Sequence, residues 1–389
     1  ATSKGATISG VTIPNAGEGY TGELPVTIIG ENLIGNVITC NDETFTNIAY
    51  LSDTKATATI TCSGVVGEST ITVTNGASSA NCTVKVVESE KCFTVGDILF
   101  SDGTRIKAQY GIPDSQLDKA FAVIASAPYG GGVGKAVGLQ KSASYLMWAS
   151  SDTTGYYTNF TGIQGTRTSG DMDGSDNWEY ICSIDPEGTQ DAATNYPAFN
   201  FALTYGTQAG LTETEYENGW YVPSVAELYD VYTNKEVVQT SLNAAVGFTL
   251  ETGNYWSSSQ YASDNFYAYH VIFYNGDVYD GSKYGNRYVF VLQAFNAEQF
   301  NNYEVTTIPS ITSVTVANAG EGYTGELPVT IIGENLKGYV ITCSDSSFGN
   351  VNYVSDNMIK ATVNCNGIVG ENTITVTSGG ISSATGTLK

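Results

Sequence analysis

The chain carries few of the side chains that enzymes use for proton transfer or nucleophilic attack. It has one histidine, His270, so it can form neither a histidine pair for a metal ion nor a recognisable Ser-His-Asp or Cys-His set. The glycine-rich stretch GGGVGK at 130–135 resembles a phosphate loop, but Ala136 stands where Ser or Thr would bind magnesium, which predicts a flexible turn instead. We therefore expect that the protein is not an enzyme and that His270, considered alone, is a solvated surface residue.

One acidic cluster could bind a cation. In DMDGSDNWEY at 171–180, Asp171, Asp173 and Asp176 surround a glycine turn as carboxylates do at the start of an EF-hand loop. The twelfth residue of such a loop should be glutamate, and here it is Cys182. The favoured interpretation is a polar surface turn, with a structural calcium ion as the alternative, and no other cofactor is expected.

The most distinctive segment is rich in tyrosine. Residues 255–295 hold 8 of the 26 tyrosines, interleaved with Ser, Asn, Asp and Gly. Tyrosine offers a large contact area at low entropic cost, and Ser, Gly and Asn add adaptable hydrogen bonds, so this mixture is typical of recognition surfaces. The alternative is that these tyrosines pack a β-rich core.

Composition limits the partners of the chain. The 389 residues suffice for two to four domains, and no apolar run approaches the roughly 18 residues that span a bilayer, so we expect no direct membrane span. The net charge of −23 repels phosphate backbones, which argues against nucleic acid as a partner. The beginning, ATSKGATISG, lacks the pattern of a signal peptide, so any signal or lipid anchor would lie outside this sequence.

Cysteine spacing predicts disulfides and an extracellular location. Cys40 and Cys62 are 22 residues apart, and Cys343 and Cys365 repeat that spacing, as expected for one disulfide in each of two related domains. Cys82, Cys92 and Cys182 allow a Cys82–Cys92 or a Cys92–Cys182 bridge with one thiol left over. The alternative is that all seven cysteines are small buried apolar residues.

The related domains are an internal repeat. VTIPNAGEGYTGELPVTIIGENL at 11–33 returns as VTVANAGEGYTGELPVTIIGENL at 314–336, with a constant offset of 303. Short alternating runs separated by Gly, Asn and Asp predict a β-sandwich of about 80 residues in each copy. The copies resemble IPT/TIG immunoglobulin-like domains, which implies a role as spacers or as assembly modules. Between the copies, Ser224 and Glu227 form a capping box that begins an amphipathic helix, and a second helix is expected at 237–245.

The middle of the chain resembles a family. GDILFSDGT, NYPAFNFALTYGT at 195–207, GWYVPSVAEL at 219–228, YWSSSQYAS at 255–263 and YVFVLQAF at 288–295 occur in the order found in C-type-lectin-fold variable proteins of diversity-generating retroelements, especially treponemal surface members. The resemblance implies an α+β C-type lectin fold whose C-terminal part is rewritten by adenine-specific mutagenesis. It also implies selective attachment of a bacterial cell-surface protein or lipoprotein to a protein or other macromolecule on a host or neighbouring cell.

The residue types allow a separate check. An AAY codon mutated at its adenines becomes NNY, which never encodes Trp, Gln, Lys, Glu or Met. Between Trp256 and Gln293 the excluded types occur only at Gln260 and Lys283.

Matching the family's constant pattern divides the segment into scaffold and contact positions. The expected scaffold consists of Ala268, Val271, Phe273, Gly276, Val278, Lys283, Tyr288 and Val289. The expected ligand contacts are Asp264, Asn265, Phe266, Tyr267, Tyr269, His270, Ile272, Tyr274, Asn275, Asp277, Tyr279, Asp280, Tyr284, Gly285, Asn286 and Arg287. Strand alternation should place Val271 and Phe273 in the core, with His270, Ile272 and Tyr274 pointing outward.

The sequence therefore predicts immunoglobulin-like sandwiches at 6–88 and 310–389 that flank a C-type-lectin-fold receptor domain at 91–296, with a linker at 297–309. Two features depart from the family: Gln293 replaces the usual arginine, and a second sandwich follows the variable segment. The first rival interpretation is a fixed structural or adhesive surface protein. The second is an enzyme of the formylglycine-generating type, although its cysteine pair has no counterpart between Cys182 and Cys343.

Overall fold

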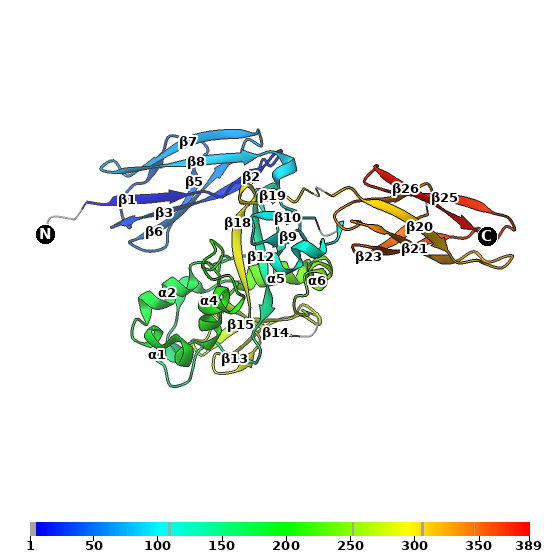
Figure 1. The fold of residues 1–389 in the computed structure, drawn as a ribbon. Helices are drawn as coiled ribbons and strands as arrows, with labels where there is room; N and C mark the ends of the chain where they lie inside the picture. Colours follow the sequence, from blue (N-terminus) through cyan, green and yellow to red (C-terminus); the bar gives the residue numbers. More distant parts are fainter. Residues whose placement is uncertain (1–4, 108–109, 251–252, 305–306, 346) are drawn as a thin grey trace. The chain divides into compact units, whose positions relative to one another are not determined.

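The fold consists mostly of β-sheet, with helices grouped in the middle of the chain (Figure 1). The computed structural model describes residues 5–107, 110–250, 253–304, 307–345 and 347–389. These fall into two compact units. One comprises residues up to 96, 122–242 and 247–301, and the other comprises 97–121, 243–246 and 302–389. Segment 97–121 thus groups with the second repeat copy.

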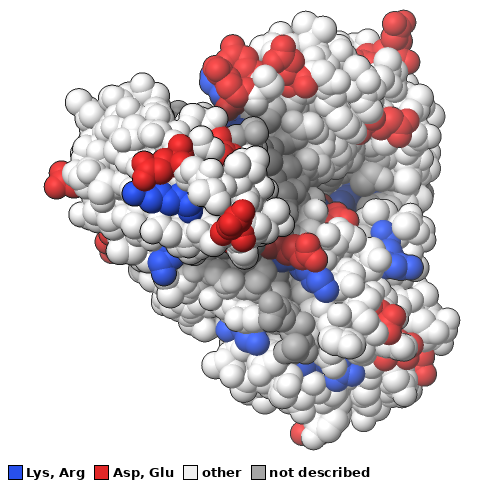
Figure 2. All heavy atoms as spheres, turned by 90° about the vertical axis from the view of Figure 1, so that its right-hand side faces the viewer, with Lys and Arg blue, Asp and Glu red and all other residues white. Residues whose placement is uncertain are grey.

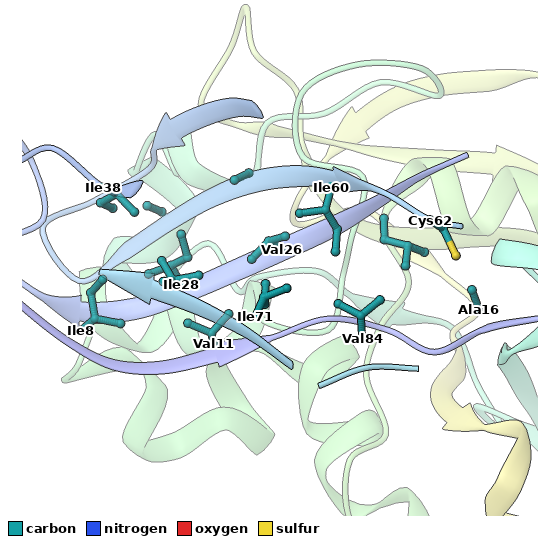
Figure 3. Close-up of a cluster of buried hydrophobic side chains, with 14 of the residues drawn as sticks. Ile8, Val11, Ala16, Val26, Ile28, Ile38, Ile60, Cys62, Ile71 and Val84 are labelled. Atoms are coloured by element: carbon teal, nitrogen blue, oxygen red, sulfur yellow. The ribbon is translucent and has the colours of Figure 1, made fainter. Parts of the chain in front are cut away.

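The first repeat copy is a β-sandwich. Its sheets have the strand orders β1-β3-β6-β5 and β2-β8-β7-β4. The strands are β1 Thr7–Thr12, β2 Ala16–Gly17, β3 Glu23–Glu31, β4 Thr39–Cys40, β5 Thr46–Tyr50, β6 Lys55–Thr61, β7 Gly67–Thr74 and β8 Ser79–Val87. Along β3, exposed and buried residues alternate, and Leu24, Val26 and Ile28 are fully buried. Figure 3 shows Val26 and Ile28 facing Ile71 and Val84 across the core.

The second repeat copy repeats this architecture. Its sheets have the orders β20-β21-β24-β23 and β22-β25-β26. The strands are β20 Ser310–Val316, β21 Glu326–Glu334, β22 Ile341–Cys343, β23 Gly349–Ser355, β24 Met358–Asn364, β25 Asn372–Ser378 and β26 Ser382–Leu388. Val329, Ile331 and Ile359 lie in its core. The prediction of two immunoglobulin-like sandwiches is confirmed as a β-sandwich architecture.

The intervening chain forms three further sheets, with the orders β18-β12-β11-β9-β10-β19, β14-β15-β16 and β13-β17. The strands are β9 Ile98–Phe100, β10 Thr104–Ile106, β11 Ala120–Ser126, β12 Val133–Lys141, β13 Leu146–Met147, β14 Asn254–Gln260, β15 Tyr267–Ile272, β16 Val278–Ser282, β17 Asn286–Arg287, β18 Phe290–Asn296 and β19 Asn301–Asn302.

Six α-helices lie among the described residues between β13 and β14. They are α1 Thr154–Tyr157, α2 Asn177–Ile184, α3 Ala192–Asn195, α4 Pro197–Gln208, α5 Val225–Thr233 and α6 Lys235–Ala244. Both predicted helices are present. The Ser224 side chain accepts from the Glu227 amide, and the Glu227 side chain accepts from the Ser224 amide, so the predicted capping box begins α5. The short 3-10 helices are η1 Ser89–Lys91, η3 Asp114–Lys119, η4 Tyr129–Gly131, η5 Thr161–Ile163, η6 Gly188–Asp191 and η7 Ala297–Gln299.

The fold continues beyond the predicted domain end at residue 296. Phe300 is 3% exposed and stacks on Tyr216 at 5.4 Å between ring centroids. The first part of the predicted linker 297–309 therefore belongs to the packed structure, because an aromatic side chain there fills the core. Residues 305–306 of that linker lie outside the described residues.

The predicted disulfides are absent: all seven cysteines are free thiols. Cys40 pairs with Val73 towards the end of β7, whereas the Cys62 amide donates to the Gly22 carbonyl, beside the Ala16 end of the core (Figure 3). The second copy repeats these positions: Cys343 pairs with Val376, and the Cys365 amide donates to the Gly325 carbonyl. The equal spacing reflects the duplication, and neither the Cys82–Cys92 nor the Cys92–Cys182 bridge forms. The disulfide argument for an extracellular location is therefore lost.

Two further observations concern the surface. Among the described residues, no helix is long and apolar enough to cross a membrane. On the face drawn in Figure 2, lysine and arginine side chains are scattered singly or in small groups among uncharged and acidic residues. That face carries no continuous basic patch for a phosphate backbone.

Candidate functional site

The tyrosine-rich segment forms the antiparallel sheet β14-β15-β16. The register places Trp256 opposite His270 on β15, and His270 opposite Tyr279 on β16. On the same strands, Tyr267 lies opposite Ser282 and Tyr269 opposite Asp280. Because neighbouring residues of a strand face opposite sides, Tyr267 and Tyr269 lie on one face of this sheet and His270 on the other.

The predicted scaffold positions are buried or partly buried. Ala268, Val271, Phe273 and Val289 are completely buried, and Phe273 packs edge-on against Tyr232 of α5 at 5.7 Å between ring centroids. At Gly276, φ is +79° and an added Cβ would lie 2.2 Å from the Tyr232 ring, so only glycine fits. Val278 and Tyr288 are half-buried. Through these contacts, the scaffold residues Phe273 and Gly276 attach the sheet to α5.

Lys283 is a buried lysine whose amino group attaches α1 to the sheet. Its Nζ donates to the carbonyl oxygens of Gly155 and Thr158 at 3.1 and 3.0 Å and to Gln260 Oε1 at 2.8 Å. The ring of Trp148 lies 4.8 Å away. Burial lowers the pKa of Lys283 to about 7. The two residues that NNY codons cannot supply, Gln260 and Lys283, are therefore bonded to each other beneath the surface.

Glu227, at the start of α5, is a second buried charged residue that joins distant segments of the chain. It is 3% exposed, and its carboxylate accepts from Lys135 Nζ at 2.6 Å, from Tyr221 Oη at 2.8 Å and from the Gly174 amide at 2.9 Å. Burial opposes a charge on Lys135, but the Glu227 carboxylate raises the pKa of Lys135 above its ordinary value. Lys135 is thus an internal ion-pair partner rather than a phosphate ligand.

Six partly exposed aromatic side chains lie on α1, on β15 and in the turn between β14 and β15. We call this group the tyrosine surface, and it consists of Tyr156, Tyr157, Tyr261, Phe266, Tyr267 and Tyr269. Phe266 contacts Tyr156 and Tyr157 at 5.3 and 5.7 Å between ring centroids, and Tyr261 packs edge-on against Tyr269 at 5.4 Å. Burial raises the pKa of Tyr269, so its hydroxyl stays protonated and can donate a hydrogen bond. All six rings retain exposed area.

Tyr156, Tyr157 and Tyr261 lie outside the predicted contact set. Tyr156 and Tyr157 are about 110 residues before Phe266 in the sequence and reach it because Lys283 holds the carbonyls on either side of them. The motif Tyr156-Tyr157 is the only local signal for them, and it does not indicate which strand they contact.

The predicted contact residues differ in exposure. Exposed positions are Tyr274, Asn275, Asp277, Tyr279, Asp280, Tyr284 and Asn286. Half-buried positions are Asp264, Asn265, Phe266, Tyr267, Tyr269, Ile272, Gly285 and Arg287. The structure does not gather them into one patch, because the two faces of the sheet and the turns at 274–277 and 284–286 divide them.

The prediction that His270 is a solvated, outward-pointing residue is wrong. Its side chain is 4% exposed and packs against Trp256 at 5.7 Å between ring centroids. Burial, together with the positive charge of Arg287, lowers the pKa of His270 to about 4. The strand alternation was correct, but Arg287 and Tyr279 cover this face.

The predicted alternative of a calcium site at Asp171, Asp173 and Asp176 is not supported. No group of three metal-ligating side chains occurs among the described residues. Asp176 forms an ion pair with Lys55, and Asp171 Oδ1 accepts from the Asp173 amide at 3.4 Å. Burial raises the pKa of Asp171 to about 6. In the structure, the Asp171 and Asp173 side chains accept from the Asp173 and Ser175 amides of this turn, and Asp176 pairs with the first sandwich.

Comparisons with known proteins identify no family. No family model matches the chain, and no curated protein matches it. Among solved structures, a fimbrial protein from Bacteroides ovatus is 14% identical, with 74% of this chain and 70% of that chain covered and a TM-score of 0.39.

Two adhesins are more distant. The adhesin InvE of Yersinia pseudotuberculosis is 13% identical, with coverage of 73% and 98% and a TM-score of 0.18. The sialic acid binding region of a Streptococcus sanguinis adhesin is 9% identical, with coverage of 100% and 78% and a TM-score of 0.19. Likenesses of this size assign neither a family nor a function.

Proposed function

We propose that this chain is a non-enzymatic receptor or adhesin of the bacterial cell surface, with a C-type-lectin-fold domain that binds a macromolecular ligand through the tyrosine surface and the adjoining turns. One observation carries the proposal. The residues that NNY codons exclude, Gln260 and Lys283, are buried and bonded to each other at 2.8 Å, while the residues around them that such codons permit are mostly exposed or half-buried. Retroelement diversification confined to NNY codons would then change the surface and leave Gln260 and Lys283 intact.

The physical properties of the tyrosine surface support a binding role. Aromatic rings with hydroxyl groups supply the anchors that dominate binding energy, and truncating one such anchor commonly costs at least about 2 kcal/mol. Tyr157 is 56% exposed, which allows it to contact a partner directly. The partner we propose is a protein or other macromolecule on a host or neighbouring cell, not nucleic acid.

The test uses the full chain on arrays of host extracellular proteins and glycans. The triple variant Tyr157→Ala, Tyr267→Ala and Tyr269→Ala should lose at least tenfold in affinity for every target that the unaltered chain binds. Tyr323→Ala, a 44% exposed tyrosine of the second sandwich, is the matched control and should retain full binding. Equal binding by the unaltered chain and the triple variant would contradict the proposal and favour a fixed adhesive protein that binds through its sandwiches.

A further inference from the structure

The sheet face opposite Tyr267 and Tyr269 carries a second group of side chains, which we call the arginine cluster: Trp256, His270, Tyr279, Gly281 and Arg287. Trp256, His270 and Tyr279 lie side by side on the three strands. The guanidinium carbon of Arg287 lies 4.8 Å from the centre of the Trp256 ring, within the range of a cation–π contact. The cluster therefore places the Arg287 guanidinium over the Trp256 ring.

Gly281 brings Arg287 and His270 together. A Cβ placed on Gly281 would lie 2.7 Å from an Nη of Arg287 and 3.3 Å from His270 Nδ1. Both groups thus lie against the Cα of Gly281. The side chain of any other residue at this position would occupy the space that they fill.

Two buried polar atoms of this cluster lack partners among the described residues, whereas Trp256 Nε1 donates to the Leu146 carbonyl at 2.9 Å and Arg287 Nη1 to the Asn286 carbonyl at 3.1 Å. Arg287 Nε and His270 Nδ1 are both inaccessible to solvent and form no hydrogen bond in the described structure. Arg287 has no carboxylate within ion-pair distance among the described residues, although the chain carries 39 acidic residues against 16 basic ones. Buried polar groups are normally hydrogen-bonded, so an orphaned pair of this kind requires an explanation.

The other two arginines of the chain have different environments. Arg105 is 2% exposed and pairs with Asp97 at 3.3 Å. Arg167 lies over the ring of Tyr229 at 4.6 Å. Arg287 is thus the arginine that combines a half-buried position, an aromatic floor and a neighbouring orphaned histidine.

The cluster has an exposed rim, and Arg287 itself is half-buried. Tyr279 is 50% exposed and Tyr284 is 52% exposed, and Asn286, beside Arg287 on β17, is also exposed. A ligand group that approached between these side chains would meet the guanidinium first and the imidazole behind it.

We propose that the arginine cluster binds an oxyanion group of the ligand, either a carboxylate or a sulfate. This inference rests on the proposed receptor function and specifies the chemistry of its ligand. Because Nε is closed to solvent, the two Nη groups of the guanidinium offer the N–H donors to such a group, and charge-assisted bonds of this kind are stronger than neutral ones. The exposed Tyr279 ring packs against the uncharged part of the same ligand, and the buried imidazole of His270 lies behind the guanidinium and senses its occupancy.

The test exploits the single histidine of the chain, because its imidazole signals in an NMR spectrum belong to His270 alone. The full chain, labelled in histidine, is titrated at pH 7 with sodium sulfate and separately with sodium acetate. Sodium chloride at matched ionic strength is the reference. We expect a saturable shift of the His270 signals with an oxyanion and none with chloride. The comparison of sulfate with acetate shows which oxyanion the site prefers.

Variants locate the effect. Arg287→Gln should lower the affinity for sulfate or acetate at least tenfold. Arg287→Lys should give an intermediate affinity, because lysine keeps the positive charge but lacks the paired N–H donors of the guanidinium. Arg167→Gln should respond like the unaltered chain. A response to both oxyanions that equals chloride, or one unchanged in Arg287→Gln, would overturn the inference.

The outcome is separable from that of the array experiment. An oxyanion response in the unaltered chain, combined with array binding that the tyrosine substitutions leave unchanged, would retain the oxyanion site and reject the proposed role of the tyrosine surface. The converse result would reject the oxyanion site alone. Thermal unfolding of each variant verifies that a lost response does not arise from lost structure.

Discussion

The two sandwiches share most of their sequence, yet they make contacts through different faces. In the first copy, the end of the sandwich is covered: an added Cβ on Gly17 would lie 2.1 Å from the Gly130 carbonyl oxygen, and Tyr20 packs edge-on against Tyr129 at 5.9 Å between ring centroids. The equivalent end of the second copy is open. Gly320 has no atom within 4 Å of an added Cβ, and a hollow of about 350 Å³ lies there, partly lined by Ile368 and Val369.

The second copy makes its contacts at Tyr353 and Gly338, away from the end that is covered in the first copy. An added Cβ on Gly111 would lie 2.9 Å from the Tyr353 ring, and the Gly338 amide donates to the Tyr110 carbonyl at 2.8 Å. Burial raises the pKa of Tyr353 to about 12. Its equivalent in the first copy, Tyr50, is 37% exposed.

Some of the sequence differences between the copies occur at these contacts. Lys55 pairs with Asp176, and Lys85 pairs with Glu298 at 2.7 Å, while the equivalent residues of the second copy are Met358 and Leu388. Conversely, Lys337 pairs with Asp114 at 2.9 Å, and its equivalent in the first copy is Ile34.

The comparison shows that a duplicated module can change its contacts by exchanging single ion-pair residues while most of its core positions stay apolar.

The largest difference between the copies is expected for glycine replacement at the covered end. Gly17→Val should destabilise the contact with Gly130 by about 3 kcal/mol, the upper end for overpacking, because a backbone carbonyl cannot move aside easily. Hydrogen exchange of amides 129–134 should accelerate in Gly17→Val and remain unchanged in Gly320→Val. Equal exchange in the two variants would remove the distinction between covered and open ends.

A smaller difference is expected for the tyrosines on the side faces. Tyr353→Ala should lower the free energy of unfolding by roughly 2 kcal/mol, less than the value for a fully buried ring because Tyr353 is only partly buried. Tyr50→Ala should cost less, although its hydroxyl also donates to the Asn36 carbonyl, at 2.5 Å. Denaturant unfolding of both variants measures the difference. A larger loss of unfolding free energy for Tyr50→Ala would contradict the account that this face is packed in the second copy and exposed in the first.

The smallest effect is expected for the ion-pair residues. Lys337→Ile, which installs the residue of the first copy, should cost about 0.5 kcal/mol, since Asp114 is largely exposed and surface pairs contribute little. Ile34→Lys should change stability by no more than about 0.5 kcal/mol. High salt should abolish the effect of Lys337→Ile, and a salt-independent loss would point to packing by the lysine stem instead.

Local patterns predicted the elements that depend on near neighbours. The capping box of Ser224 and Glu227 and the alternation along β3 are properties of a few consecutive residues, and both appear as expected. Helix α4 was not predicted. Pro197 at its first turn was an available signal, but Ala198, Phe199, Phe201 and Ala202 are all buried, and a helix with so broad an apolar face lacks clear periodicity.

The misses involve partners that are distant in sequence. Cys40 and Cys62 have the spacing of a disulfide, but Cys40 pairs with Val73 on β7, whereas the Cys62 amide donates to the Gly22 carbonyl, and both remain free thiols. Burial of His270 depends on Arg287, which returns to the sheet after the turn that follows β16. The bond between Gln260 and Lys283 was also invisible, although codon chemistry had singled out both residues.

The central claim is that the supports and the surface of the tyrosine-rich sheet are separate sets of residues, of which only the surface is rewritten. Deep sequencing of the codons for residues 240–300 in the native population tests this claim most directly. The account predicts substitutions confined to NNY codons at the exposed and half-buried positions of 264–287, with Gln260 and Lys283 constant. Invariant codons throughout this region, or variation that includes Gln260 and Lys283, would contradict it.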